Sequence, residues 1–99
     1  MEIKKTVDGT KLNFALSGRL DTTTAPVFEK ELKEALNGID DLTLDFSELD
    51  YISSAGLRVL LSAQKIMNAT KGTMKVVGAN DIVKEIFEVT GFSDILTIE

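Results

Sequence analysis

The segment that most constrains this chain is Leu44 to Leu61, LDFSELDYISSAGLRVLL, because it joins a strand pattern to a helix pattern. Apolar and polar residues alternate from Leu42 to Phe46, which is typical of a half-buried strand. Leucines then recur at helical spacing from Leu57 to Leu61. We therefore predict a strand, a polar loop over Ser47 to Asp50, and then a helix.

Two adjacent serines, Ser53 and Ser54, fall where this helix should begin. The first backbone N–H groups of a helix have no partner within the helix, and a serine hydroxyl commonly accepts a hydrogen bond from one of them. From the residues alone, the pair is best explained as a helix cap. At least one of the two hydroxyls should therefore lie beside the unpaired N–H groups.

The chain before this segment predicts a hairpin followed by a helix. Strand-like runs at Ile3–Val7 and Lys11–Ser17 flank the pair Asp8-Gly9, which favours a tight turn between antiparallel strands. Thr24 is predicted to cap the helix that follows, with Pro26 in its first turn. Asn37-Gly38 should end that helix, because both residues tolerate a left-handed backbone.

The chain after the central segment predicts two more helices and two more strands. The helix from Ser54 should reach about Asn68, and Thr73–Val77 is a short β-branched strand. Asn80 should cap the next helix, and Ile95–Ile98 should form a last strand. The residues predicted on the inner face of that helix are Ile82, Val83, Ile86 and Phe87.

The resulting order is β-β-α-β-α-β-α-β. Consecutive βαβ units require right-handed crossovers and a mostly parallel sheet, and the first strand joins as an antiparallel hairpin partner. We therefore predict one α/β domain over residues 1–99, with a mixed, mostly parallel sheet and three main helices.

Composition narrows the possible functions. The 99 residues are 43% hydrophobic and 27% charged, and their formal net charge of −5 argues against a nucleic-acid binder. The chain has no histidine or cysteine, which removes the commonest general base and the commonest metal ligands, so we expect no enzyme, cofactor or metal. No apolar run approaches the ~18 residues that span a bilayer, and we expect a cytoplasmic protein with no membrane partner.

Acidic residues flank the central strand at Asp40-Asp41, Glu48 and Asp50. Such carboxylates could bind a hard metal ion, although charges of this kind in loops are usually only solvated. A small-ligand or carboxylate-metal enzyme domain therefore remains one alternative.

Three segments together resemble the bacterial anti-sigma factor antagonists, which are small single-domain members of the STAS superfamily. They are GRLDTTTA at Gly18–Ala25, the central segment at Leu44–Leu61, and IFEVTGFSDILTI at Ile86–Ile98. The central segment is the most specific of the three. The resemblance covers nearly the whole chain and implies the STAS fold.

The resemblance implies regulation by partner switching. In this family the unphosphorylated antagonist binds an anti-sigma factor that is also a serine kinase, and this binding frees a sigma factor. The kinase phosphorylates a serine at a helix start and thereby abolishes binding. A metal-dependent serine phosphatase restores the antagonist.

Carried onto this chain, the resemblance makes Ser54 the phosphoacceptor. Many antagonists have an aspartate directly before that serine, whereas this chain has Ser53, which is therefore a rival acceptor. The partner-binding residues implied or predicted are Asp21, Thr22, Thr23, Ser53, Ser54, Gly56 and Arg58. Gly56 is expected either to leave room for the partner or to serve packing, and Arg58 to face a phosphate on Ser54 or to be an exposed helix charge.

A second alternative is a STAS adaptor that is not phosphorylated and docks on a transporter or signalling complex. Ser54 would then be only a cap. In either case we expect a monomer or a weak dimer.

Overall fold

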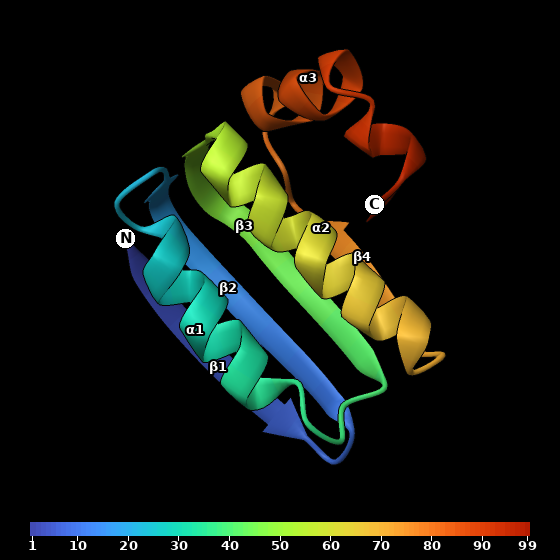
Figure 1. Cartoon of the computed structure of the whole chain (residues 1–99). Helices are drawn as coiled ribbons and strands as arrows, with labels where there is room; N and C mark the ends of the chain where they lie inside the picture. Colours follow the sequence, from blue (N-terminus) through green and yellow to red (C-terminus); the bar gives the residue numbers. More distant parts are fainter.

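The computed structural model describes all 99 residues and has the predicted order of strands and helices (Figure 1). The elements in chain order are β1 (Glu2–Asp8), β2 (Lys11–Leu20), α1 (Ala25–Ala35), β3 (Asp41–Ile52), α2 (Ser54–Ala69), β4 (Thr73–Val77), α3 (Asp81–Val89), the short 3-10 helix η1 (Phe92–Asp94) and β5 (Thr97–Ile98).

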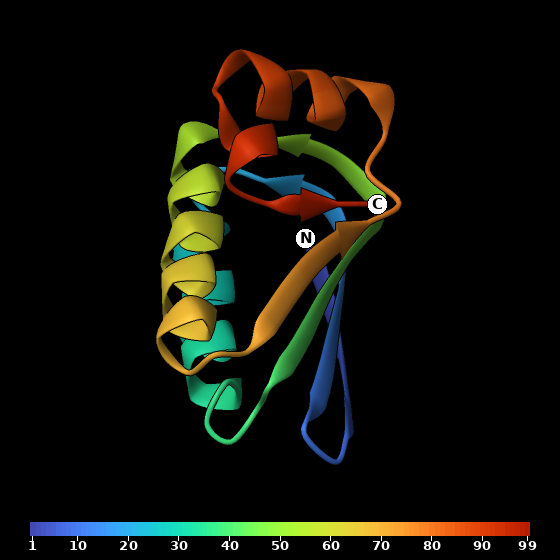
Figure 2. The same ribbon diagram turned by 90° about the vertical axis from the view of Figure 1, so that its right-hand side faces the viewer.

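The five strands form one sheet in the order β1-β2-β3-β4-β5. β1 pairs with β2 antiparallel, and the other three strand pairs are parallel. The prediction of a mostly parallel sheet with an antiparallel N-terminal hairpin is therefore confirmed. The connections from β2 to β3 and from β3 to β4 advance across the sheet in the same direction. Because such crossovers are right-handed, α1 and α2 cover the same face (Figure 2).

The core lies between this face of the sheet and the two helices. Leu12, Phe14 and Leu16 of β2 point into it and are each at most 2% exposed. Phe14 meets Phe28 of α1 edge to face, with 5.6 Å between the ring centroids. The helices are thus fixed to the sheet by large apolar side chains at alternate strand positions.

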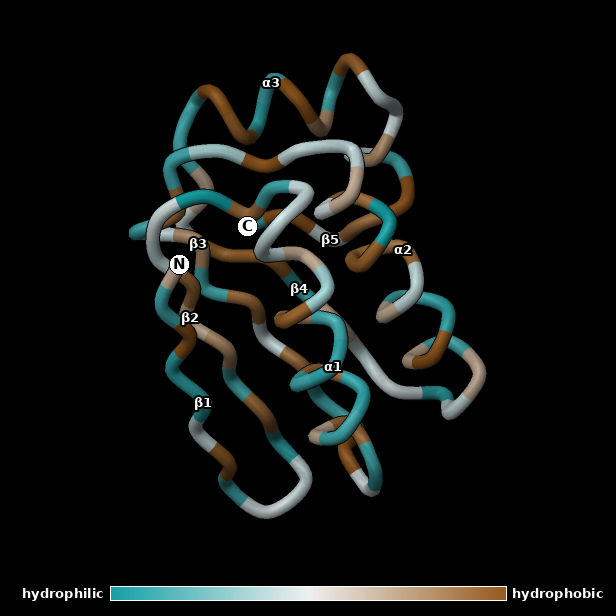
Figure 3. The backbone as a smooth tube through the Cα atoms, turned by 60° about the vertical axis from the view of Figure 1, so that its left-hand side comes forward, coloured by the Kyte–Doolittle hydropathy of each residue, from teal (hydrophilic) through white to brown (hydrophobic).

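The other face of the sheet carries no helix (Figure 2). Polar residues such as Lys11 and Asn13 occupy the positions between the buried ones, and hydropathy alternates along the strands (Figure 3). Mostly parallel sheets usually have both faces covered, so this open polar face is a distinctive feature of the molecule.

The prediction of a loop over Ser47–Asp50 is wrong, because β3 continues through these residues to Ile52. β2 is also longer than predicted and reaches Leu20 instead of ending at Ser17. The two extensions pair with each other across shifts in register, with Ser17 opposite Glu48. Polar residues here face solvent from a paired strand, so polarity alone did not indicate a loop.

Three smaller predictions are also corrected. Thr24 occupies the cap position of α1 but its side chain makes no capping bond to the helix. Ile82 of α3 is 59% exposed, because only Val83 and Phe87 turn fully inward. The last strand is only Thr97–Ile98, since η1 takes up the preceding residues.

Asn80 connects α3 to the central strand, as well as capping the helix as predicted. Its side-chain oxygen accepts a hydrogen bond from Val83 N at 2.8 Å, and its Nδ2 donates to the Leu49 carbonyl at 3.0 Å. α3 therefore lies across the carboxyl end of β3 (Figure 1). No helix of the structure has the length and apolar character needed to cross a membrane.

Candidate functional site at the start of helix α2

Ser53 is the cap of α2. Its hydroxyl oxygen accepts a hydrogen bond from Gly56 N at 3.4 Å, and its own N–H donates to the Leu20 carbonyl at 2.9 Å. The second bond ties the helix start to the end of β2. Ser53 is half-buried, and both its side chain and its backbone serve the fold.

Ser54 is the first residue of α2 and is exposed. Its hydroxyl makes no hydrogen bond within the chain, unlike that of Ser53. An anion at this position would meet the unpaired N–H groups of the first turn, which favour negative charge by about 0.3 to 1 kcal/mol. The two neighbouring serines are therefore chemically distinct: one is a cap and the other is free to react.

Gly56 lies beneath this surface and is buried. A Cβ at this position would lie 2.8 Å from Ile52 Cγ1 and 2.9 Å from Leu20 Cγ, which is too close for real atoms. Glycine therefore lets the first turn of α2 rest directly on the ends of β2 and β3. Of the two roles expected for it, the geometry supports packing.

The loop between β2 and α1 is organised by Asp21. Its Oδ1 accepts hydrogen bonds from Thr23 Oγ1 at 2.8 Å, Thr23 N at 3.0 Å and Thr24 N at 3.1 Å. These bonds, above all the one from the Thr23 hydroxyl, lower the pKa of the Asp21 carboxyl. Thr24 Oγ1 accepts from Asp21 N and donates to the Arg19 carbonyl, both at 2.8 Å, which explains why it does not cap α1.

A shallow groove of about 290 Å³ runs between the starts of α1 and α2. Thr22 of the Asp21 loop and Arg58 of α2 both line this groove. Arg58 is exposed and forms none of the three ion pairs in the structure. The remaining lining residues are Ala25, Pro26, Glu29, Ala55 and Val59.

The predicted site residues thus meet at the carboxyl ends of β2 and β3. Asp21, Thr22 and Thr23 come from the loop after β2, while Ser53, Ser54 and Arg58 come from the start of α2. The Ser53 N–H to Leu20 carbonyl bond holds these two segments together.

The sequence analysis missed two further residues beside this site. The Arg19 guanidinium stacks on the ring of Tyr51, with 4.5 Å from its central carbon to the ring centroid, and its Nε lies 4.0 Å from Asp21 Oδ2. The two residues are neighbours only because the β2–β3 register pairs them. Because the sequence analysis ended β2 at Ser17, it did not predict that Arg19 pairs with Tyr51.

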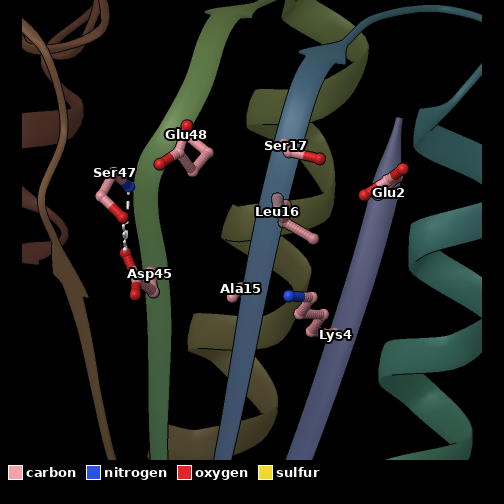
Figure 4. Close-up of a pocket in the computed structure, with 8 residues that line it drawn as sticks. All are labelled: Glu2, Lys4, Ala15, Leu16, Ser17, Asp45, Ser47 and Glu48. Carbon is pink, nitrogen blue, oxygen red and sulfur yellow. Dashed lines mark hydrogen bonds between the residues drawn. The ribbon is translucent and has the colours of Figure 1, made fainter.

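A second hollow, of about 380 Å³, lies on the open face of the sheet (Figure 4). Lys4 of β1 and Ala15 of β2 line it together with Asp45, whose Oδ1 accepts a hydrogen bond from Ser47 Oγ at 2.7 Å. None of the predicted site residues lines this hollow. The structure contains no group of three or more acidic side chains placed to bind one metal ion.

The order of the elements and the mixed sheet agree with the STAS fold that the sequence resemblance implied. The profile of the STAS domain family matches residues 2–99, and the chain belongs to this family. The resemblance seen in the three sequence segments is confirmed.

Curated relatives match almost the whole chain. The BtrV protein of Bordetella bronchiseptica is 36% identical over 93 residues, which are 93% of this chain and 79% of that protein. The anti-sigma-B factor antagonist of Listeria monocytogenes is 32% identical over 101 aligned positions, covering 100% of this chain and 87% of the relative.

The fold also matches solved structures. An anti-sigma factor antagonist from Mycobacterium paratuberculosis superposes with a TM-score of 0.87 at 19% identity, over 98% of this chain and 83% of that one. At this level of identity the match concerns the fold alone.

Proposed function

We propose that this chain is an anti-sigma factor antagonist that acts by partner switching in the cytoplasm. In its unphosphorylated form it binds an anti-sigma factor serine kinase and thereby frees a sigma factor. Phosphorylation of Ser54 by that kinase ends the complex, and a metal-dependent serine phosphatase reverses the modification. The chain itself is regulatory and not catalytic, and it works as a monomer or weak dimer.

The observation that carries this proposal is the difference between the two serines. Ser53 Oγ is engaged by Gly56 N, whereas Ser54 is exposed at the first helical position with an unbonded hydroxyl. A kinase needs an accessible hydroxyl, so Ser54 is the acceptor and Ser53 the cap. The anti-sigma-B factor antagonist of Listeria supports the choice of function, because it aligns with the whole of this chain.

The fold should tolerate a phosphate at Ser54. The modification adds a charge of about −1.5 to −2, and the helix start favours an anion there. Arg58, one helical turn further on and without an ion pair, can approach the phosphate at i,i+4 spacing. Phosphorylation therefore does not act by unfolding the domain.

The switch then acts at the interface with the kinase. Asp21 directly follows Leu20, whose carbonyl accepts the bond from Ser53 N, so its carboxylate lies at the same end of the sheet as Ser54, and a phosphate would add like charge there. A 100- to 1,000-fold loss of affinity requires about 2.7 to 4.1 kcal/mol, and burying an unpaired phosphate against a partner can cost that much.

The test uses the anti-sigma factor kinases of the source genome, each purified and titrated against this chain by calorimetry. One kinase should bind the wild type and Ser54→Ala tightly and bind Ser54→Asp at least about 10-fold more weakly, since aspartate supplies part of the charge of a phosphate. With ATP, mass spectrometry should find phosphate on Ser54 in the wild type and in Ser53→Ala, and none in Ser54→Ala.

Ser53→Ala is the matched control, because it removes the neighbouring hydroxyl and leaves the acceptor. Phosphate found only on Ser53 would reassign the acceptor. Binding to none of the kinases, with no phosphate at either serine, would overturn the proposal and favour the adaptor alternative.

A further inference from the structure

The stack of Arg19 on Tyr51 lies directly beside the proposed docking surface. The β2–β3 register pairs Arg19 with Tyr51, and the next pair, Leu20 with Ile52, leads into the Asp21 loop on one strand and into Ser53 on the other. The two strands run side by side to this end of the sheet (Figure 1). The stack is thus within two residues of both segments of the site.

The Arg19 guanidinium is held on two sides. The Tyr51 ring supports its flat face at 4.5 Å, and Asp21 Oδ2 lies 4.0 Å from its Nε. Asp21 is itself fixed by the backbone N–H groups of Thr23 and Thr24. The Arg19 and Asp21 side chains are 61% and 32% exposed, and such surface pairs contribute little to stability, so the arrangement mainly sets the direction of the guanidinium.

The outer edge of this guanidinium is available. Only Nε has an ion-pair partner in the chain, which leaves the two terminal nitrogens free. Their parallel N–H groups match the two oxygens of a carboxylate, and a guanidinium already held in place loses little freedom on binding. Arg19 is one of only two arginines in a chain with a net charge of −5.

We infer that the Arg19–Tyr51 stack is a specificity-determining part of the docking surface and receives a carboxylate side chain of the anti-sigma factor kinase. Arginine and tyrosine are the residue types most often found to dominate protein interfaces. The inference rests on the proposed function and deepens it, since it names a contact that distinguishes one kinase from another. Ser54 decides when the kinase binds, and Arg19 helps to decide which kinase binds.

The test measures the affinity of the full chain for the kinase identified above, with Lys11→Glu as the matched control. Lys11 lies at the opposite end of β2, about 26 Å away, so the control makes the same change in charge far from the stack. Arg19→Glu should weaken binding about 10- to 100-fold, whereas Lys11→Glu should change it less than about 3-fold.

Conservative variants then test the geometry. Arg19→Lys keeps the charge but cannot form the bidentate contact with a carboxylate, so it should weaken binding about 3- to 10-fold. Tyr51→Leu should lose affinity because the stack is gone, and Tyr51→Phe, which keeps the ring under the guanidinium, should lose less affinity than Tyr51→Leu. Thermal unfolding of each variant checks that the domain remains folded.

The contact is identified by exchanging charges. Kinase variants in which single surface carboxylates are replaced by lysine should include one that restores binding to Arg19→Glu. If Arg19→Glu binds like Lys11→Glu while Ser54→Asp is weakened, the inference is overturned and the proposed function stands. If the wild type binds no kinase, both fail.

The alternative role for Arg19 is to bind the phosphate of phosphorylated Ser54. In that case Arg19→Glu would leave the affinity of the unphosphorylated chain unchanged and would shift the ³¹P titration of phosphorylated Ser54. That pair of results would also overturn the inference.

Discussion

The starts of α2 and α3 lie at the same end of the sheet, but their capping hydrogen bonds differ. At α3 a single residue, Asn80, caps the helix at 2.8 Å and also bonds the Leu49 carbonyl at 3.0 Å. At α2 the cap bond from Ser53 is longer, at 3.4 Å, and the next residue leaves its hydroxyl unbonded at the surface.

In the proposed function, this difference separates a helix start that serves stability from one that leaves a hydroxyl free for modification. At the α3 start both polar atoms of the cap side chain are bonded, one to the helix and one to β3, so a change there should damage the fold. At the α2 start the roles are separate. Ser53 caps the helix and Gly56 packs it against the sheet, whereas Ser54 should contribute almost nothing to stability. A modified residue can change charge without unfolding the domain only where the fold does not depend on it.

The largest effect on stability is expected for Asn80→Ala. It removes the cap of α3, worth about 1 kcal/mol, and leaves the Leu49 carbonyl without its partner, which costs about 1 to 3 kcal/mol more. Chemical denaturation should therefore show a loss of about 2 to 4 kcal/mol. Asn80→Ser keeps a capping oxygen and lacks the amide group that reaches Leu49, so it should fall between wild type and Asn80→Ala. Equal losses for the two variants would mean that the cap contributes nothing.

Gly56→Ala should be the next most damaging change. The added methyl group would meet Ile52 and Leu20, and overpacking of this kind costs about 1 to 3 kcal/mol, offset by up to about 1 kcal/mol of better helix propensity. The variant should be less stable in urea and bind the kinase more weakly, because the α2 start must move outward. Wild-type stability would show that the first turn shifts at no cost.

Ser53→Ala should have a smaller effect. The capping bond is long, so we expect a loss of about 0.5 to 1 kcal/mol in the free energy of unfolding. Ser53→Asp supplies another capping oxygen and should recover most of it. A loss as large as that of Asn80→Ala would remove the contrast between the two helix starts.

The Asp21 loop should give a small, pH-dependent effect. Hydrogen bonds, first of all from the Thr23 hydroxyl, lower the folded-state pKa of Asp21 below its unfolded value, which is near 4. The stabilisation is therefore present above about pH 4 and is lost as pH falls through the lower, folded-state pKa. The difference in melting temperature between wild type and Asp21→Asn should shrink on acidification over that range.

Thr23→Val provides the control for this assignment, because it removes the first of these hydrogen bonds while keeping the carboxyl group. The pKa of Asp21 should then rise toward its usual value, so the acid-induced loss of stability should be smaller and should be complete at a higher pH. If Thr23→Val lost stability on acidification over the same pH range as the wild type, the Thr23 hydroxyl would not be what lowers the pKa of Asp21.

Ser54→Ala should have the smallest effect on stability, within about 0.5 kcal/mol of wild type, because the side chain is exposed and unbonded. The comparison with Ser53→Ala in the same denaturation series is direct, since the residues are adjacent. If Ser54→Ala proved the more damaging, the assignment of cap and acceptor would be reversed.

Much of the fold could be predicted from the sequence because the apolar periodicity is clear. Alternation in β2 and β3 and the leucines of α2 set the type and order of the elements, and the Asp8-Gly9 turn indicated the hairpin. The failure at Ser47–Asp50 has a physical cause. The open face of the sheet carries polar residues, so a strand that lies along it has the composition of a loop.

The sequence by itself determined that a serine pair opens a helix after a buried strand, and that an acidic, threonine-rich segment precedes another helix. Only the tertiary structure decided which of the two serines caps the helix and which has an unbonded hydroxyl. The direction of each hydroxyl depends on the bond from Ser53 N–H to the Leu20 carbonyl and on the packing of Gly56 over Ile52. It also decided that Arg19 lies on Tyr51, since strand register is set by contacts between residues far apart in the chain.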